Sequence, residues 1–171
     1  QGHVVNSGTI RSTGEYDFGG MFVPGEFSDA VGFFGDFGDP FDMPFEGIGR
    51  VDNLEGGVIE GSRAAIFLDG GGEISNAGRI SADVCAIYAQ GYATGDPVSF
   101  TLNNSGTIER SGELFGQNVD AVGTIRISSS NDLTEATINN SGTILSPDNV
   151  IVASIGTVLN NETGGLLDAV K

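Results

Sequence analysis

Short apolar segments alternate with turns rich in Asn and Gly along most of this chain. The heptad LNNSGTI at 102–108 returns as INNSGTI at 138–144, and a shorter copy, VVNSGTI, stands at 4–10. Helix formers are sparse and β-branched residues are common, which favours strands joined by turns. Recurrence of the same short unit along a chain is typical of repeat architectures.

Six asparagines mark the repeat, and each is followed by Gly and then by Thr-Ile or a similar apolar pair. They are Asn6, Asn53, Asn76, Asn104, Asn140 and Asn161, separated by steps of 47, 23, 28, 36 and 21 residues. One or two positions before each lies an apolar residue: Val5, Val51, Ile74, Leu102, Ile138 and Leu159. The turns after Asn53 and Asn161 carry two extra residues and a Gly-Gly, so the turn has a short and a long form.

A second apolar segment follows the turn, clearest as AAIFLDG at 64–70 and CAIYAQG at 85–91. Looser equivalents are AVGFF at 30–34, AVGTIRI at 121–127 and VIVASIG at 150–156. Each unit therefore holds two or three short strands and cannot bury its apolar face alone. We predict one all-β domain over 1–171, a parallel β-solenoid (β-helix), with a right-handed coil as the expected form.

The heptad then marks a corner between two stacked strands. Ile138 and Ile144 are expected to face the core, and Asn and Gly to supply the left-handed backbone of a sharp corner. Stacked corners place Asn above Asn, where side-chain amides can bond to each other and to turn backbone. The six anchor asparagines are thus predicted to form a ladder that fixes the register between coils.

Units of the form I-N-N-S-G-T-I, a variable turn, then A-I and a Gly resemble the passenger regions of bacterial autotransporters and related surface β-helix adhesins. The resemblance covers about 48–166, with a further start at 4–10. It implies a parallel β-helix, export across two membranes, and a role outside the cell at the bacterial surface.

Residues 15–47 interrupt the repeat and are predicted to form an insertion. Eight of the eleven Phe and eight acidic residues lie there, without Lys or Arg. Aromatic side chains on a rigid scaffold can bind a partner, for which the candidates are Phe33, Phe34, Phe37, Phe41 and Phe45. The alternatives are packing against the solenoid or its end, since monomers rarely expose so large an apolar patch, and stacking on a carbohydrate.

Three carboxylates within this stretch, Asp36, Asp39 and Asp42, stand at three-residue spacing and could bind a hard cation. Calcium is therefore the one possible cofactor, although the sequence lacks the EF-hand or nonapeptide calcium pattern. No other cofactor is expected.

Composition narrows the function. The formal net charge is −16, which disfavours nucleic acid and anionic membranes as partners. No apolar run is long enough to span a membrane as a helix. The lone histidine, His3, stands near the N-terminus, the lone cysteine, Cys85, aligns with Ala64 as a small core residue, and the seven basic residues are scattered. We therefore expect no enzyme.

The first repeat begins at residue 4 and the last ends near 167, which leaves little sequence for caps. Either the chain is cut from a longer passenger, or its open ends stack on other copies and give a filament. The hypothesis that follows is a self-associating extracellular structural protein whose partners are its own copies or another surface protein. The alternatives are an adhesin that binds a host or glycan ligand and a polysaccharide-active β-helix enzyme.

Overall fold

The computed structural model describes residues 2–12, 29–33, 48–91, 97–112, 123–128 and 133–169. These residues form strands and turns only, in three parallel sheets stacked as successive coils. The predicted parallel β-solenoid is confirmed. Within the described ranges, no helix has the length and apolar character needed to cross a bilayer.

Successive coils contribute one strand to sheet A, one to sheet B and, in the first five coils, one to sheet C. Sheet A contains β1 (Gly2–Asn6), β4 (Gly49–Asn53), β7 (Gly72–Asn76), β10 (Val98–Asn104), β13 (Leu133–Asn140) and β16 (Gly156–Asn161). Sheet B contains β2 (Thr9–Arg11), β5 (Val58–Gly61), β8 (Arg79–Ala82), β11 (Thr107–Arg110), β14 (Thr143–Ser146) and β17 (Leu166–Ala169). Sheet C contains β3 (Val31–Phe33), β6 (Ala64–Asp69), β9 (Cys85–Gln90), β12 (Gly123–Ser128) and β15 (Asn149–Ala153).

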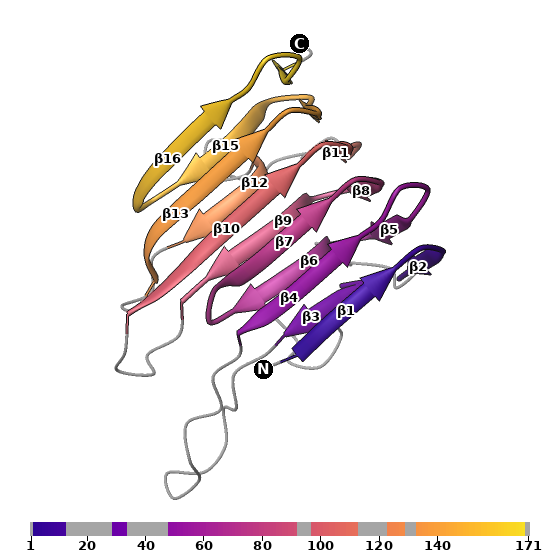
Figure 1. Ribbon diagram of the computed structural model, residues 1–171, viewed down its shortest axis with the longest axis horizontal. Coiled ribbons are helices and arrows are strands. Elements are labelled where there is room, and N and C mark those ends of the chain that lie inside the picture. The colour runs from indigo at the N-terminus through magenta and orange to yellow at the C-terminus, as the bar shows by residue number, and fades with distance from the viewer. Residues whose placement is uncertain are drawn as a thin grey trace, which may run out of the picture.

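We number the coils 1 to 6 from the N-terminus: coil 1 holds β1, β2 and β3, and coil 6 holds β16 and β17. The two ends of the chain lie at opposite ends of this stack (Figure 1). Because each strand pairs with its equivalent one coil away, each coil presents a similar backbone edge to the next coil.

The core is a set of in-register apolar rows that run along the stack. In sheet A the row is Val4, Val51, Ile74, Leu102, Ile138 and Leu159. In sheet B it is Ile10, Ile59, Ile80, Ile108, Ile144 and Leu167. Coils 2 to 5 bury their members of both rows completely. The first member in sheet A is Val4, whereas Val5, the apolar residue directly before Asn6, pairs with Asp52 and is exposed on the outer face.

In coils 3 to 5, the glycines of the short turns are required by space and not by a left-handed backbone. A methyl group on Gly106 would lie 2.1 Å from the carbonyl oxygen of Gly78, and one on Gly142 would lie 2.2 Å from that of Gly106. Among the described glycines, positive φ within the anchor turns occurs at Gly56 and Gly164, both in long turns. The left-handed backbone predicted for the glycines of the short turns is therefore wrong. Glycine is needed at Gly78, Gly106 and Gly142 because the stacked coils approach too closely for a side chain.

The predicted insertion at 15–47 is not continuous. Residues 31–33 form β3, which pairs with β6 as the third strand of coil 1. The ring of Phe33 packs against the core over Gly2 and Gly49. The long step between Asn104 and Asn140 is one coil, since β12 lies between β9 and β15 in sheet C.

Candidate functional site: the asparagine ladder and the coil ends

The six anchor asparagines form one continuous hydrogen-bonded ladder at the corner between sheets A and B. The Nδ2 atom of each donates to the Oδ1 atom of the next, from Asn6 to Asn161, over distances of 2.7 to 2.9 Å. The predicted ladder is therefore observed. The ladder has a direction, because every side-chain amide in it donates toward the C-terminal end of the stack.

Each ladder amide also holds its own corner together. Asn104, for example, donates to the carbonyl oxygen of Gly106 at 3.3 Å and to that of Thr143 in the next coil at 3.4 Å. The ladder side chains from Asn6 to Asn140 are buried. Because buried amides need partners, the ladder stabilises the stack only in the register in which all of them are bonded.

A second, shorter ladder runs on the outer face of sheet A. Asn160 donates to Asn139 at 2.8 Å, and Asn139 donates to Asn103 at 2.8 Å. This direction is opposite to that of the inner ladder. The doubled Asn of the NNSG motif thus supplies one amide to the inner row and one to the outer row.

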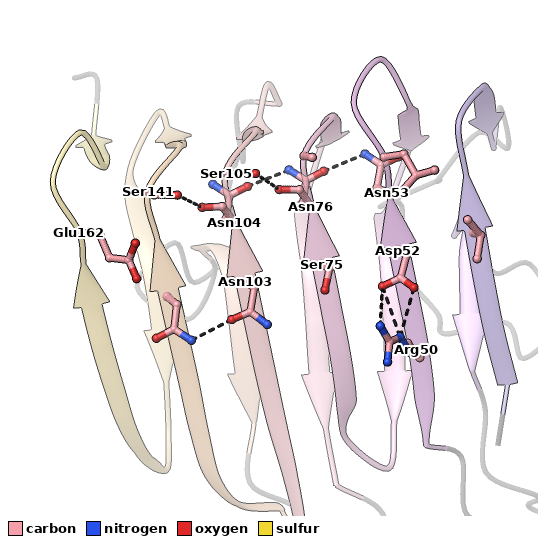
Figure 2. Close-up of a pocket in the computed structure, with 14 residues that line it drawn as sticks. Arg50, Asp52, Asn53, Ser75, Asn76, Asn103, Asn104, Ser105, Ser141 and Glu162 are labelled. Carbon is pink, nitrogen blue, oxygen red and sulfur yellow. Dashed lines mark hydrogen bonds and ion pairs between the residues drawn. The ribbon is translucent and has the colours of Figure 1, made fainter.

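The two ladders border a shallow groove of about 390 Å³ that crosses all six coils (Figure 2). We call it the ladder groove; its lining includes Val5, Asp52, Ser75, Asn103, Asn139 and Glu162. Figure 2 shows Arg50 and Asp52 paired toward one end of the groove and Glu162 at the other end. The groove therefore offers a line of polar atoms at a spacing of about one coil, roughly 4.8 Å.

Ion pairs join neighbouring coils on the outer faces. Arg79 bonds Glu109 at 2.7 Å and Glu60 at 2.8 Å, and Glu60 also pairs with Arg11. The hydrogen bond from Arg11 is the main reason that the pKa of Glu60 lies below its usual value. Desolvation opposes the shift at Asp52, but hydrogen bonds from His3 and Arg50 outweigh it and lower the pKa of that carboxyl.

The outer face of sheet C carries an aromatic and guanidinium stack. The rings of Phe67 and Tyr88 meet edge to face at 5.2 Å, and the guanidinium carbons of Arg63 and Arg126 lie 5.5 and 4.9 Å from the centres of those two rings. Arg63 also pairs with Asp29 at 2.7 Å. These contacts link coils 1 to 4 and stabilise their stacking.

The two ends of the stack expose groups that the inner coils bury. In coil 6, Leu159 is 44% exposed although the core-row residues of coils 2 to 5 are fully buried. Asn161, the last residue of the ladder, is exposed and bonds the carbonyl oxygen of Gly165 at 3.0 Å. In coil 1, Asn6 accepts from the Gly8 amide at 3.1 Å where the other ladder residues accept from a preceding Asn.

The remaining candidates separate by location. Phe34, Phe37, Phe41 and Phe45 lie outside the described residues, as do Asp36, Asp39 and Asp42. In the part of the chain that the structure describes, no cluster of three or more metal-ligating side chains occurs.

The lone histidine and the lone cysteine serve structural contacts. His3 bonds Asp52 at 2.7 Å on the outer face of sheet A. Cys85 is buried beside the equivalent Ala64 and donates to the carbonyl oxygen of Ile87, and burial raises the pKa of its thiol to about 12. A protonated, buried thiol is a poor nucleophile.

Sequence reasoning missed three features that only stacking reveals. The side chain of Arg110 is fully buried and pairs with Asp148 one coil away. Arg11 and Asp168 stand at equivalent positions at opposite ends of sheet B. Gly8 stands at the close-approach position of the short turn, yet a methyl group there would meet nothing within 4 Å.

Comparison of the chain with protein-family models, with curated proteins and with solved structures found no match. The candidate site therefore rests on its geometry.

Proposed function

We propose that this protein is a non-enzymatic structural protein of the bacterial cell surface that self-associates end to end through its solenoid coils. The observation that carries the proposal is the exposure of core-row and ladder groups at the ends of the stack, with Leu159 44% exposed in coil 6. An uncovered coil presents strand edges and apolar side chains that favour addition of another coil.

Two further observations support this proposal. The lone histidine, His3, bonds Asp52, and the lone cysteine, Cys85, is buried and donates to the carbonyl oxygen of Ile87, so both are engaged in structural contacts. The resemblance of the INNSGTI units to autotransporter passengers supports an extracellular place of action. A stiff stack of repeated coils suits a role in building an extended surface structure.

The direct test is sedimentation velocity of the 171-residue chain over a hundredfold range of concentration, with negative-stain microscopy of the same samples. We expect particles that lengthen with concentration while keeping one width. A single monomeric species at every concentration would contradict self-association. Screening for turnover of polyuronates and neutral glycans tests the non-enzymatic part, which any acid-dependent cleavage would overturn.

The ladder groove favours one alternative, an adhesin that binds an extended polar chain such as a glycan. Its lining of Asn, Ser and carboxylate side chains supplies both donors and acceptors along coils 2 to 6. Glycan-array binding that is lost on Asn139→Ala, whose side chain lies on the outer ladder, would favour this alternative.

A further inference from the structure

The two ends of this solenoid complement each other in detail. We infer that coil 6 of one copy docks on coil 1 of a second copy in the same parallel register that joins successive coils within the chain. This inference rests on the proposed self-association and assigns its interface, its polarity and the side chains that select it.

The turn geometry of the two ends reproduces a step that already exists inside the molecule. Coil 6 has the long anchor turn, as coil 2 does, and coil 1 has the short turn, as coil 3 does. Between coils 2 and 3, the amide of Ala77 donates to Asn53 O and that of Arg79 donates to Gly57 O, both at 2.8 Å. Docking coil 6 on coil 1 repeats this long-to-short step.

The equivalent atoms are available at both ends. Ser7 and Thr9 in coil 1 match Ala77 and Arg79, and Asn161 and Gly165 in coil 6 match Asn53 and Gly57. The amides of Ser7 and Thr9 would therefore donate to the carbonyl oxygens of Asn161 and Gly165 of the second copy.

The ladder polarity fixes which end meets which. Every ladder amide donates toward the C-terminal end, so Nδ2 of Asn161 is the terminal donor and Oδ1 of Asn6 is the terminal acceptor. Only the head-to-tail arrangement joins this donor to this acceptor. The same register places Leu159 on Val4 and Leu167 on Ile10, which continues both apolar rows.

Charge complementarity selects the same register. On the outer face of sheet B, Arg11 pairs with Glu60 in coil 2 and remains exposed, and Asp168 is exposed in coil 6. Docking places Asp168 of one copy directly opposite Arg11 of the next. Arg11 would then lie between two carboxylates, as Arg79 lies between Glu60 and Glu109.

Gly8 is the most specific indicator. Its equivalents Gly78, Gly106 and Gly142 cannot carry a side chain, since a methyl group would lie 2.1 to 2.2 Å from a carbonyl oxygen of the preceding coil. Gly8 has open space within 4 Å in the single chain. A docked coil 6 would place the carbonyl oxygen of Gly165 at this position and so explain the glycine.

Sheet C limits the strength of this junction. Within the described residues, sheets A and B have six strands and sheet C has five, so the inferred junction pairs strands of sheets A and B. We expect the junction to dissociate at a denaturant concentration well below that which unfolds the coils.

The first experiment compares Gly8→Ala with Gly156→Ala by sedimentation velocity in about 0.15 M salt, where repulsion between acidic copies is screened. Both added methyl groups meet nothing within 4 Å in the single chain. Gly8→Ala is expected to weaken association by more than tenfold with an unchanged urea midpoint of the monomer. Gly156→Ala should assemble like the wild type, since residue 156 alternates with the core-facing Thr157 and Leu159. Equal assembly of the two variants would overturn the inferred interface.

The second experiment exchanges charges between copies. Arg11→Asp alone and Asp168→Arg alone place like charges at the junction, and each is expected to stay monomeric. An equimolar mixture restores opposite charges at every junction and should form alternating rods. No assembly of the mixture, or full assembly of either variant alone, would contradict the interface. If the wild type itself fails to assemble, the proposed function fails and not only this register.

Discussion

Asn104 illustrates how a single side chain fixes the register of this fold. It accepts from Asn76 at 2.8 Å and donates to Asn140 at 2.7 Å, so it joins three coils while buried. Any shift of one residue would turn every ladder amide to the outer face and every outer side chain into the core. The ladder therefore acts against misregister as well as for stability.

Replacing Asn104 by Ala is expected to lower the free energy of unfolding by about 2 to 4 kcal/mol, because the buried Oδ1 atom of Asn140 loses its hydrogen-bond donor. Urea denaturation followed by circular dichroism measures this. Asn103→Ala, one position away on the outer face, is the matched control and should cost less than about 1 kcal/mol. Equal effects of the two substitutions would mean that the inner ladder is not the stabilising row.

Cys85 is expected to be inert in the folded protein. Burial raises the pKa of its thiol to about 12, and the side chain is enclosed between sheets. A thiol reagent such as a disulfide dye should therefore label native protein at least a hundredfold more slowly than urea-unfolded protein at pH 8. Comparable rates in the two states would show that the sheet around Cys85 opens readily.

At the scale of strands and turns, the outer faces hold coils together by ion pairs that cross from one coil to the next. Arg79 contacts carboxylates on both sides, and Arg50 reaches Asp52 on its own strand and Glu73 in the next coil. The chain has 23 acidic and 7 basic residues, so each arginine placed between carboxylates relieves repulsion along a row.

These pairs predict how stability depends on pH. The pKa values of Glu60 and Asp52 are lowered in the folded state, so the folded protein binds fewer protons than the unfolded chain near pH 4. The stability that these two carboxylates contribute is fully present above their ordinary pKa values of 4.5 and 3.8. It is lost as the pH falls through their lower pKa values in the folded state.

Thermal unfolding measured from pH 7 to pH 3 tests this dependence. The midpoint temperature of unfolding is expected to decrease as the pH is lowered below about 4.5. The double variant Glu60→Gln, Asp52→Asn should start lower at pH 7 and show a flatter profile. A wild-type midpoint that rises toward pH 3 would contradict the assignment.

At the scale of the whole molecule, stability is expected to vary along the stack, since each coil contacts only its neighbours. Coils 3 to 5 have a complete coil on at least one side and fully buried core rows, whereas coil 6 exposes Leu159 and Leu166. The ends should therefore open more often than the centre.

Hydrogen exchange tests this gradient. At low protein concentration the amides of β16 and β17 are expected to exchange fastest among the paired strands, and those of β7, β8, β10 and β11 slowest. At concentrations where rods form, β16, β17, β1 and β2 should gain protection while the centre is unchanged. Uniform exchange along the stack would contradict the prediction that the stability of each coil depends on its contacts with neighbouring coils.

Much of this fold was predictable from the sequence because its repeat is local. The spacing of Asn53, Asn76 and Asn104 and the apolar pairs that follow them specify one coil each, and a coil with one apolar face has to stack. The same pattern identified the ladder, since equivalent residues of a stacked repeat lie one above another.

Other features followed from contacts that no local pattern contains. The corner glycines suggested a left-handed backbone, but the reason for them is the carbonyl oxygen of the preceding coil, as at Gly106. In the first coil the core residue is Val4 and not the adjacent Val5, because the strand pairs in the register that aligns Val4 with Val51.

The sequence by itself determined the solenoid, its coils and its Asn ladder, because these depend on residues a few positions apart that recur. Only the tertiary structure decided the direction of the ladder, the partners of each ion pair, and the match between Asp168 and Arg11. These depend on which residues the stack brings to the same height, and that is a property of the assembled coils and not of any one of them.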